Sequence, residues 1–169
     1  MKVAVEVRPA DAAPASVEYT WDPDTEILSA QRTPRATGDG DGASATVGLE
    51  GRDGSWLILD VAAGRINGVE VAVWPDVRKL PALHPPTQIE DAEVVLPKGN
   101  GKADVASLEM ETRLVAEADN DQRNFHFRVG APRLARTVRV ARDLLVDVDD
   151  KNRISGVWLL NVPPCPTEL

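Results

Sequence analysis

The chain contains one hairpin pattern twice, and this repeat constrains the fold more than any other feature. In residues 56–75 and again in 143–163, an apolar strand ends in Asp-Val and a polar turn follows. Arg-Ile-(Asn or Ser)-Gly-Val then opens a second apolar strand that ends at proline. Gly68 and Gly156 of this motif are 88 positions apart (156−68), as are the two closing prolines. Such a repeat predicts two copies of one β unit.

Strand patterns dominate the rest of the chain as well. Val3, Val5 and Val7 alternate with polar or small residues, and this period of two is typical of a strand with one buried face. Clusters of Pro, Gly and Asp separate such segments. The pattern predicts a long loop at 33–44 and strands at 1–8, 16–21, 26–32, 45–50, 56–61, 66–74, 94–97, within 104–118, and at 123–129, 136–141, 143–148 and 154–161.

These segments predict an all-β fold with little helix. We expect two tandem copies of a five- to six-stranded antiparallel unit, at 1–77 and 92–164, joined by a Pro-rich linker at 78–91. One such unit alone would expose an apolar face and two sheet edges to water. Packing the two units face to face covers both faces, so we expect a single domain that is a pseudo-twofold sandwich or barrel.

The repeated motif has a structural explanation. We expect Asp60 to lie opposite Asn67 across the first hairpin, and Asp147 opposite Ser155 across the second, as polar cross-strand pairs. A β-bulge at each motif glycine would return the following valines to the core side, because glycine tolerates the bulge backbone. We therefore assign a structural role to the full motif, which consists of Asp60, Arg65, Gly68, Asp147, Arg153 and Gly156.

Charge and composition restrict the classes of partner. The net charge is −8 and the isoelectric point is near 4.8, which opposes binding to nucleic acid or to anionic membranes. The one cysteine, Cys165, cannot form an internal disulfide, and no Cys/His cluster is present for zinc, so we expect no metal and no cofactor. The N-terminus does not resemble a signal peptide, and no apolar run approaches ~20 residues, so we expect a cytoplasmic protein.

Few residues are candidates for chemistry. The segment from Asp39 to Glu50 partly resembles a calcium loop but lacks the central glycine, and a flexible loop is the better interpretation. His84 lies in the Pro-rich linker, and His126 alternates with two phenylalanines, which places it on the opposite, exposed or interfacial face. Tryptophans beside carboxylates can stack on sugars, although burial in the core is the commoner role of tryptophan. The candidate ligand-binding residues are Trp74, Trp158, Glu70 and His126.

The two most informative segments are Val17–Leu28, which contains Trp-Asp-Pro-Asp, and Ala135–Trp158, which contains the second hairpin. Together they resemble a small bacterial family known as domain of unknown function twenty-two eighty-three. Its short β units open with an Asp-Pro turn between two strands and close with an Asp…Arg-Ile-x-Gly hairpin. The chain departs from that pattern at Ala62-Ala63, where acidic turn residues are usual. The resemblance implies the duplicated β architecture and carries no activity, cofactor or catalytic residue with it.

Three functions remain open from the sequence. The first is a non-catalytic structural or protein-interaction module, with a protein partner or self-association. The second is a small-ligand or carbohydrate-binding module that uses Trp and carboxylate side chains. The third is a hydrolase with two carboxylates ~5–9.5 Å apart. No assembled catalytic set is recognisable in the sequence, which favours the first function and argues against an enzyme.

Overall fold

The structure is a computed structural model that describes residues 3–10, 14–33, 45–96 and 107–166. The described residues form fourteen β-strands and no helix, so the all-β prediction is confirmed. Nothing in this part of the chain is a helix long and apolar enough to cross a membrane. Most of the predicted 33–44 loop, with the calcium-like start at Asp39, lies outside the described residues. The strands are β1 (Glu6–Pro9), β2 (Ser16–Asp22), β3 (Ile27–Thr33), β4 (Ala45–Gly51), β5 (Trp56–Ala62), β6 (Arg65–Val73), β7 (Val77–Lys79), β8 (Ile89–Val95), β9 (Ser107–Thr112), β10 (Leu114–Ala118), β11 (Phe125–Val129), β12 (Ala135–Ala141), β13 (Leu144–Asp149) and β14 (Ile154–Leu159).

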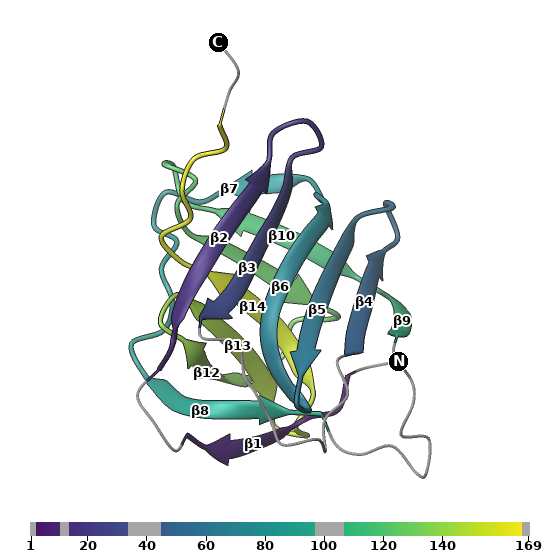
Figure 1. The fold of residues 1–169 in the computed structure, drawn as a ribbon, viewed down its shortest axis with the longest axis vertical. Coiled ribbons are helices and arrows are strands. Elements are labelled where there is room, and N and C mark those ends of the chain that lie inside the picture. The colour runs from purple at the N-terminus through teal and green to yellow at the C-terminus, as the bar shows by residue number, and fades with distance from the viewer. Residues whose placement is uncertain (1–2, 11–13, 34–44, 97–106, 167–169) are drawn as a thin grey trace.

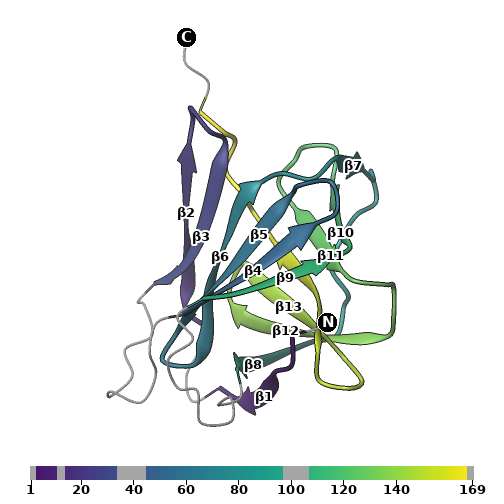
Figure 2. The ribbon, with the colours of Figure 1, turned by 90° about the vertical axis from the view of Figure 1, so that its right-hand side faces the viewer.

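One sheet curls back on itself so that its two parts face each other (Figures 1 and 2). We call β2-β3-β6-β5-β4-β9 the front layer and β7-β10-β11-β14-β13-β12-β8 the rear layer, with β1 paired to β8. The layers are joined by the pairing of Arg65 in β6 with Val95 in β8. They also meet where β9 runs into β10, so the strand expected within 104–118 is divided between them.

The sequence predicted antiparallel pairing throughout, but three of the strand pairs are parallel. β4 pairs in parallel with β9, β12 with β8, and β10 with β7. The alternation of buried and exposed residues has the same period in both kinds of strand, so it cannot distinguish them. β7 and the start of β8 also occupy part of the segment predicted as linker.

The core lies between the two layers. Leu57 and Leu59 of β5 face inward from the front layer, and Phe127 of β11 and Val146 of β13 face them from the rear layer. All four side chains are completely buried. Each such side chain contributes about 1.5–3 kcal/mol by leaving water. The alternation in the sequence is therefore the direct cause of the two-layer arrangement.

Both motif hairpins form, and each contains the expected bulge. The register slips between Asp60 and Val61 in the first hairpin and between Asp147 and Val148 in the second. The predicted cross-strand partners were wrong, because Asp60 lies opposite Gly68 and Asp147 opposite Gly156. The bulge adds one extra residue to the returning strand, and this residue is Asn67 or Ser155 itself.

A crossover connection passes the outer face of the rear layer, which is the face turned away from the core. Residues 80–88 link β7 to β8, which are six strand spacings apart in the rear layer. That separation is roughly 29 Å along a sheet, and ten Cα steps span at most roughly 36 Å. The connection is therefore nearly extended, which its three prolines favour. Figure 2 shows it outside the rear layer.

Candidate functional site

His126 occupies the centre of the outer face of the rear layer. It lies in β11 opposite Glu117 of β10 on one side and Trp158 of β14 on the other. Because Phe125 and Phe127 point into the core, His126 points outward, as the alternation predicted. Its side chain is nevertheless only 13% exposed. The site is thus a buried polar group on an outer face.

Two carboxylates flank the imidazole ring. Nε2 of His126 lies 2.8 Å from Oδ2 of Asp147, and Nδ1 lies 3.7 Å from Oε1 of Glu117. The second oxygen of Asp147 accepts a hydrogen bond of 2.8 Å from the Thr137 hydroxyl. Trp158 stacks on the imidazole with a centroid distance of 3.9 Å and an interplanar angle of 10°. This cluster, which we call the His126 cluster, links five neighbouring strands.

Gly156 makes the contact between His126 and Asp147 possible. It pairs with Arg128 on one side and with Asp147 on the other. A Cβ at this position would overlap Oδ2 of Asp147 and would lie 3.0 Å from Nε2 of His126. The absence of a side chain opens the diagonal path along which the two side chains meet. The motif glycine therefore serves the polar cluster as well as the bulge.

Two polar groups beside the imidazole are buried without a well-oriented partner. Oε1 of Glu117 lies 2.9 Å from Nε of Arg128, which makes an ion pair but not a hydrogen bond of good geometry. Within the described part of the chain, the indole N–H of Trp158 has no hydrogen-bond partner. Leaving a buried donor or acceptor unsatisfied costs about 1–3 kcal/mol. The cluster is held in place by the surrounding strands rather than by ideal hydrogen bonding.

The arrangement does not provide a free catalytic base. A general base needs one ring nitrogen directed at a substrate or a nucleophile, and both nitrogens of His126 face carboxylates instead. The two carboxylates lie at opposite nitrogens, so the ring separates them from a common metal ion. Among the described residues, no group of three His, Cys, Asp or Glu side chains has the geometry of a metal site. A cavity of about 300 Å³ adjoins His126, Arg128, Asp147 and Ser155.

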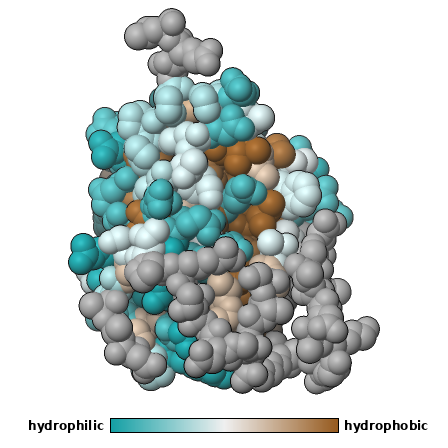
Figure 3. Space-filling view, viewed as in Figure 1, coloured by the Kyte–Doolittle hydropathy of each residue, from teal (hydrophilic) through white to brown (hydrophobic). Residues whose placement is uncertain are grey.

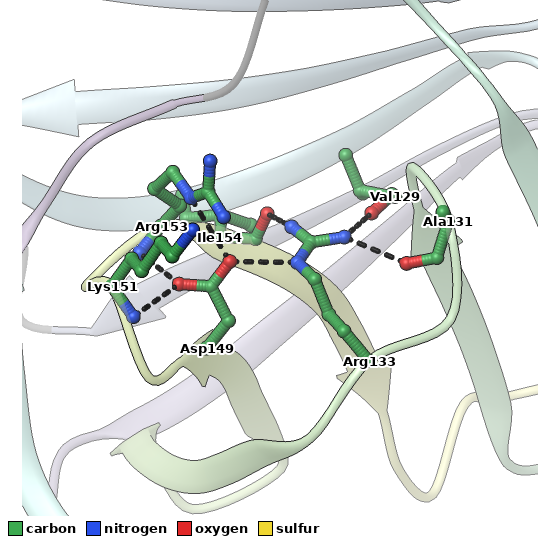
Figure 4. A network of polar contacts seen from close by, with 7 residues as sticks. All are labelled: Val129, Ala131, Arg133, Asp149, Lys151, Arg153 and Ile154. Carbon is green, nitrogen blue, oxygen red and sulfur yellow. Dashed lines mark hydrogen bonds and ion pairs between the residues drawn. The ribbon is translucent and has the colours of Figure 1, made fainter.

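A second polar network lies next to this cavity and fastens the loop between β11 and β12 (Figure 4). Nε of Arg133 donates to Oδ2 of Asp149 at 2.7 Å, and the rest of the guanidinium donates to the carbonyl oxygens of Val129, Ala131 and Ile154. Arg153 of the repeated motif adds a contact of 3.1 Å to the same carboxylate. Every donor group of Arg133 is thus engaged, and Arg133 is not available to a ligand.

The carboxylate of Asp149 is completely buried. Burial alone raises its pKa, but the hydrogen bond from Arg133, the backbone N–H groups of Arg153 and Lys151 and the charge of Arg153 outweigh it and lower the pKa to about 2. Asp149 is therefore ionised at neutral pH, and its charge is balanced by two guanidinium groups. This network was not predicted, because Arg133 and Asp149 lie at different turns, sixteen positions apart in the chain.

The other predicted ligand-binding residues lie elsewhere. Trp74 packs between the layers, where it stacks with Trp21 at 5.8 Å and donates to the carbonyl oxygen of Glu26. Glu70 lies on the outer face of the front layer, between Ser29 and Ile58. Of the four candidates, only His126 and Trp158 are brought together. Trp158 is 5% exposed, and His126 covers one face of its ring.

The remaining motif residues lie in the first hairpin. Arg65 forms an ion pair of 3.1 Å with Glu93 of β8, which supports the junction between the layers. Asp60 lies between Thr46 and Gly68, just as Asp147 lies between Thr137 and Gly156. The strand beside the first hairpin places Ser29 opposite Glu70. At the equivalent position, the strand beside the second hairpin places His126 opposite Trp158. The polar cluster is therefore specific to the second half.

The outer face of the front layer carries a surface that sequence reasoning did not single out. Trp56 and Val73 are cross-strand neighbours in β5 and β6, and they are 37% and 46% exposed. Figure 3 shows apolar side chains at the surface over these strands. Glu50 of β4 lies beside Trp56, and Glu111 of β9 lies beside Glu50. The signal in the sequence was the alternation of β5, which places Trp56 out of phase with the core leucines.

Comparison with known proteins adds no assignment. No family model matches the chain, and no curated protein matches its sequence. The geometry of the two outer faces is therefore the basis for the function.

Proposed function

We propose that the protein is a non-catalytic protein-interaction module that binds its partner through the outer face of the front layer. The observation that carries this proposal is the difference between the two outer faces. The 80–88 crossover runs over the rear layer, where Leu145 and Trp158 are buried although they point outward. The front layer has Trp56 and Val73 at its surface. Adjoining apolar side chains at the surface are candidates for an interaction site, and tryptophan is enriched in such sites.

The state of the polar clusters supports a role without catalysis. His126 is held between two carboxylates, and Arg133 uses all its donor groups within the fold. These side chains tie neighbouring strands and loops together, which is a structural role. An interaction module needs such a rigid support, because ordering a mobile surface on binding reduces affinity.

One double variant and one single control variant test the proposal. Trp56→Ser with Val73→Ser removes the apolar pair from the front layer, and Leu134→Ser removes an 88%-exposed leucine from a loop of the rear layer as the control. Tagged wild-type protein and both variants would be used for capture from a lysate and for light scattering after size exclusion. We expect the front variant alone to lose the captured proteins or the self-association of the wild type. A wild type that is monomeric and retains nothing, or equal retention by all three, would contradict the proposal.

We also infer that the two halves are copies of one β unit, as the resemblance to domain of unknown function twenty-two eighty-three implies. The matched bulges of the two hairpins support this inference. The pairing of Ala4 with Arg153 also parallels that of Val95 with Arg65. The two arginines are 88 positions apart (153−65) and their partners 91 (95−4). Superposition of 56–75 on 143–163 in an experimental structure would test the duplication, and unlike hairpins would exclude it.

The alternative of carbohydrate binding is not supported at Trp74 and Trp158, the two tryptophans for which the sequence left it open. A sugar-stacking platform needs an exposed indole face beside polar side chains. Trp158 is buried against His126, and Trp74 packs on Trp21 and two phenylalanines. A cytoplasmic location stays a prediction from the sequence.

A further inference from the structure

We infer that the partner of the front layer presents a basic, extended polypeptide segment. This inference rests on the proposed interaction function and adds the chemistry of the partner. The surface concerned, which we call the Trp56 surface, consists of Trp56, Val73, Ile58, Glu50, Glu70 and Glu111. It combines an apolar strip with three carboxylates on neighbouring strands.

The carboxylates of the Trp56 surface are uncompensated. Glu50 and Glu111 lie directly opposite each other on the parallel strands β4 and β9, and both are exposed. Like charges in this position are destabilising. Among the described residues, no ion pair involves Glu50, Glu70 or Glu111. A cationic partner would relieve this repulsion, and the fold by itself does not.

The negative charge is concentrated in the first half of the sequence, which supplies five of the six strands of the front layer. Residues 1–77 contain thirteen Asp and Glu against six Lys and Arg, a net charge of −7. Residues 78–169 contain fourteen against thirteen, a net charge of −1. On the rear layer, the exposed carboxylates Glu90 and Asp91 are paired with arginines. The strands and turns of the front layer, residues 16–33, 45–73 and 107–112, contain ten Asp and Glu against three Lys and Arg, so the field at this layer favours cations.

The apolar strip explains why the partner is a polypeptide rather than a small cation. Val73 and Trp56 lie side by side across β6 and β5, with Glu50 as the next side chain on β4. Ile58 follows two positions along β5, with Glu70 beside it. Apolar and acidic groups are thus interleaved at the spacing of adjacent strands, ~4.8 Å. In an extended segment, the side chains at positions i and i+2 face the same way, ~6.8 Å apart, so a segment with basic and apolar residues at alternate positions of one face presents both kinds of group to this surface.

A short peptide that repeats Lys-Ser-Val-Ser places lysine and valine alternately on one face when it is extended, and is a direct probe. Titration calorimetry would measure its dissociation constant with wild-type protein and with Glu50→Lys. The control Asp121→Lys makes the same charge change at an exposed turn residue between β10 and β11. We expect Glu50→Lys and Trp56→Ser each to weaken binding about tenfold, and Asp121→Lys less than about twofold. We also expect the wild-type affinity to fall as salt is added.

Each other outcome is informative. Equal weakening by Glu50→Lys and Asp121→Lys would show that the peptide senses only the net charge, and the inference would be wrong. Spermine that competes as well as the peptide would identify a site for small cations and overturn the polypeptide assignment. If the peptide does not bind, yet capture from a lysate still depends on Trp56 and Val73, the interaction function stands and only the basic character of the partner is wrong.

Discussion

Replacement of Arg133 by methionine would test how the loop that bears Leu134 is held. Methionine keeps much of the apolar stem of arginine and removes the guanidinium. The change deletes four hydrogen bonds, one to Asp149 and three to carbonyl oxygens. It leaves a fully buried carboxylate whose remaining partners are Arg153 and two backbone N–H groups.

The expected loss of unfolding free energy is large. Removal of one partner from a buried ion pair costs about 3–5 kcal/mol, because the other charge stays buried. For a chain of this length, each kcal/mol lowers the midpoint of thermal unfolding by about 2–4 °C. We therefore expect Arg133→Met to lower the midpoint by about 6–20 °C. Urea unfolding, followed by tryptophan fluorescence, would give the free energy directly.

Arg136→Met is the matched control, because it makes the same substitution three positions after Arg133. Arg136 lies 3.5 Å from Glu90, and both side chains are about half exposed. Exposed ion pairs contribute little, so we expect this variant to lose less than about 0.5 kcal/mol. The pair of variants separates the effect of burial from the effect of losing an arginine.

The pH dependence checks the same explanation independently. The pKa of Asp149 is lowered from 3.8 to about 2, so the carboxylate stabilises the folded protein above pH 4, by about 2 kcal/mol. This contribution is lost as the pH falls through 4 toward 2. Because Arg133 is the main source of the lowering, we expect the difference between wild type and Arg133→Met to narrow over that range. A loss below about 1 kcal/mol at pH 7, or a difference that does not change with pH, would refute the reasoning.

Three further predictions follow from single contacts. Gly156→Ala should lose about 2–4 kcal/mol in urea unfolding, because the new Cβ overlaps Asp147 and breaks its contact with the imidazole; a neutral variant would contradict the proposed role of this glycine. Tyr19 is the only tyrosine, and burial, then the charge of Asp143, raise its pKa despite its hydrogen bond to Leu160, so its stabilising effect falls as the pH rises above 10. Tyrosinate absorbance should appear in alkaline solution only together with unfolding, and ionisation near pH 10 in the folded protein would exclude this burial. Trp56→Ser should change the unfolding free energy by less than about 1 kcal/mol, since the side chain is part-exposed; a larger loss would mean that Trp56 serves the fold.

Much of the fold was accessible from the sequence because strand alternation is a local property. The phase of Leu57 and Leu59 predicted which face of β5 is buried, and the position of Gly68 predicted the bulge. The phase of His126 between two phenylalanines likewise predicted its outward direction. Burial of His126 was not predictable, because the side chains around it, Glu117, Asp147 and Trp158, belong to three other strands.

The candidate sites were predictable only in part, for the same reason. His126 and Trp158 were chosen separately, and their stacking depends on β11 and β14 being neighbours. Glu117 was missed because nothing near it in the sequence marks it as the partner of a histidine. Trp56 was passed over for Trp74, since the sequence does not distinguish a tryptophan at the surface from one packed between layers.

The sequence alone determined the class of fold, the positions of most strands and the two bulged hairpins, because each depends on residues close together in the chain. The tertiary structure decided which strands pair in parallel, which polar side chains meet, and which outer face stays uncovered. Those outcomes depend on register and strand order over the whole sheet. A shift of β11 by one residue would turn His126 inward and separate it from Asp147, although the sequence would be unchanged.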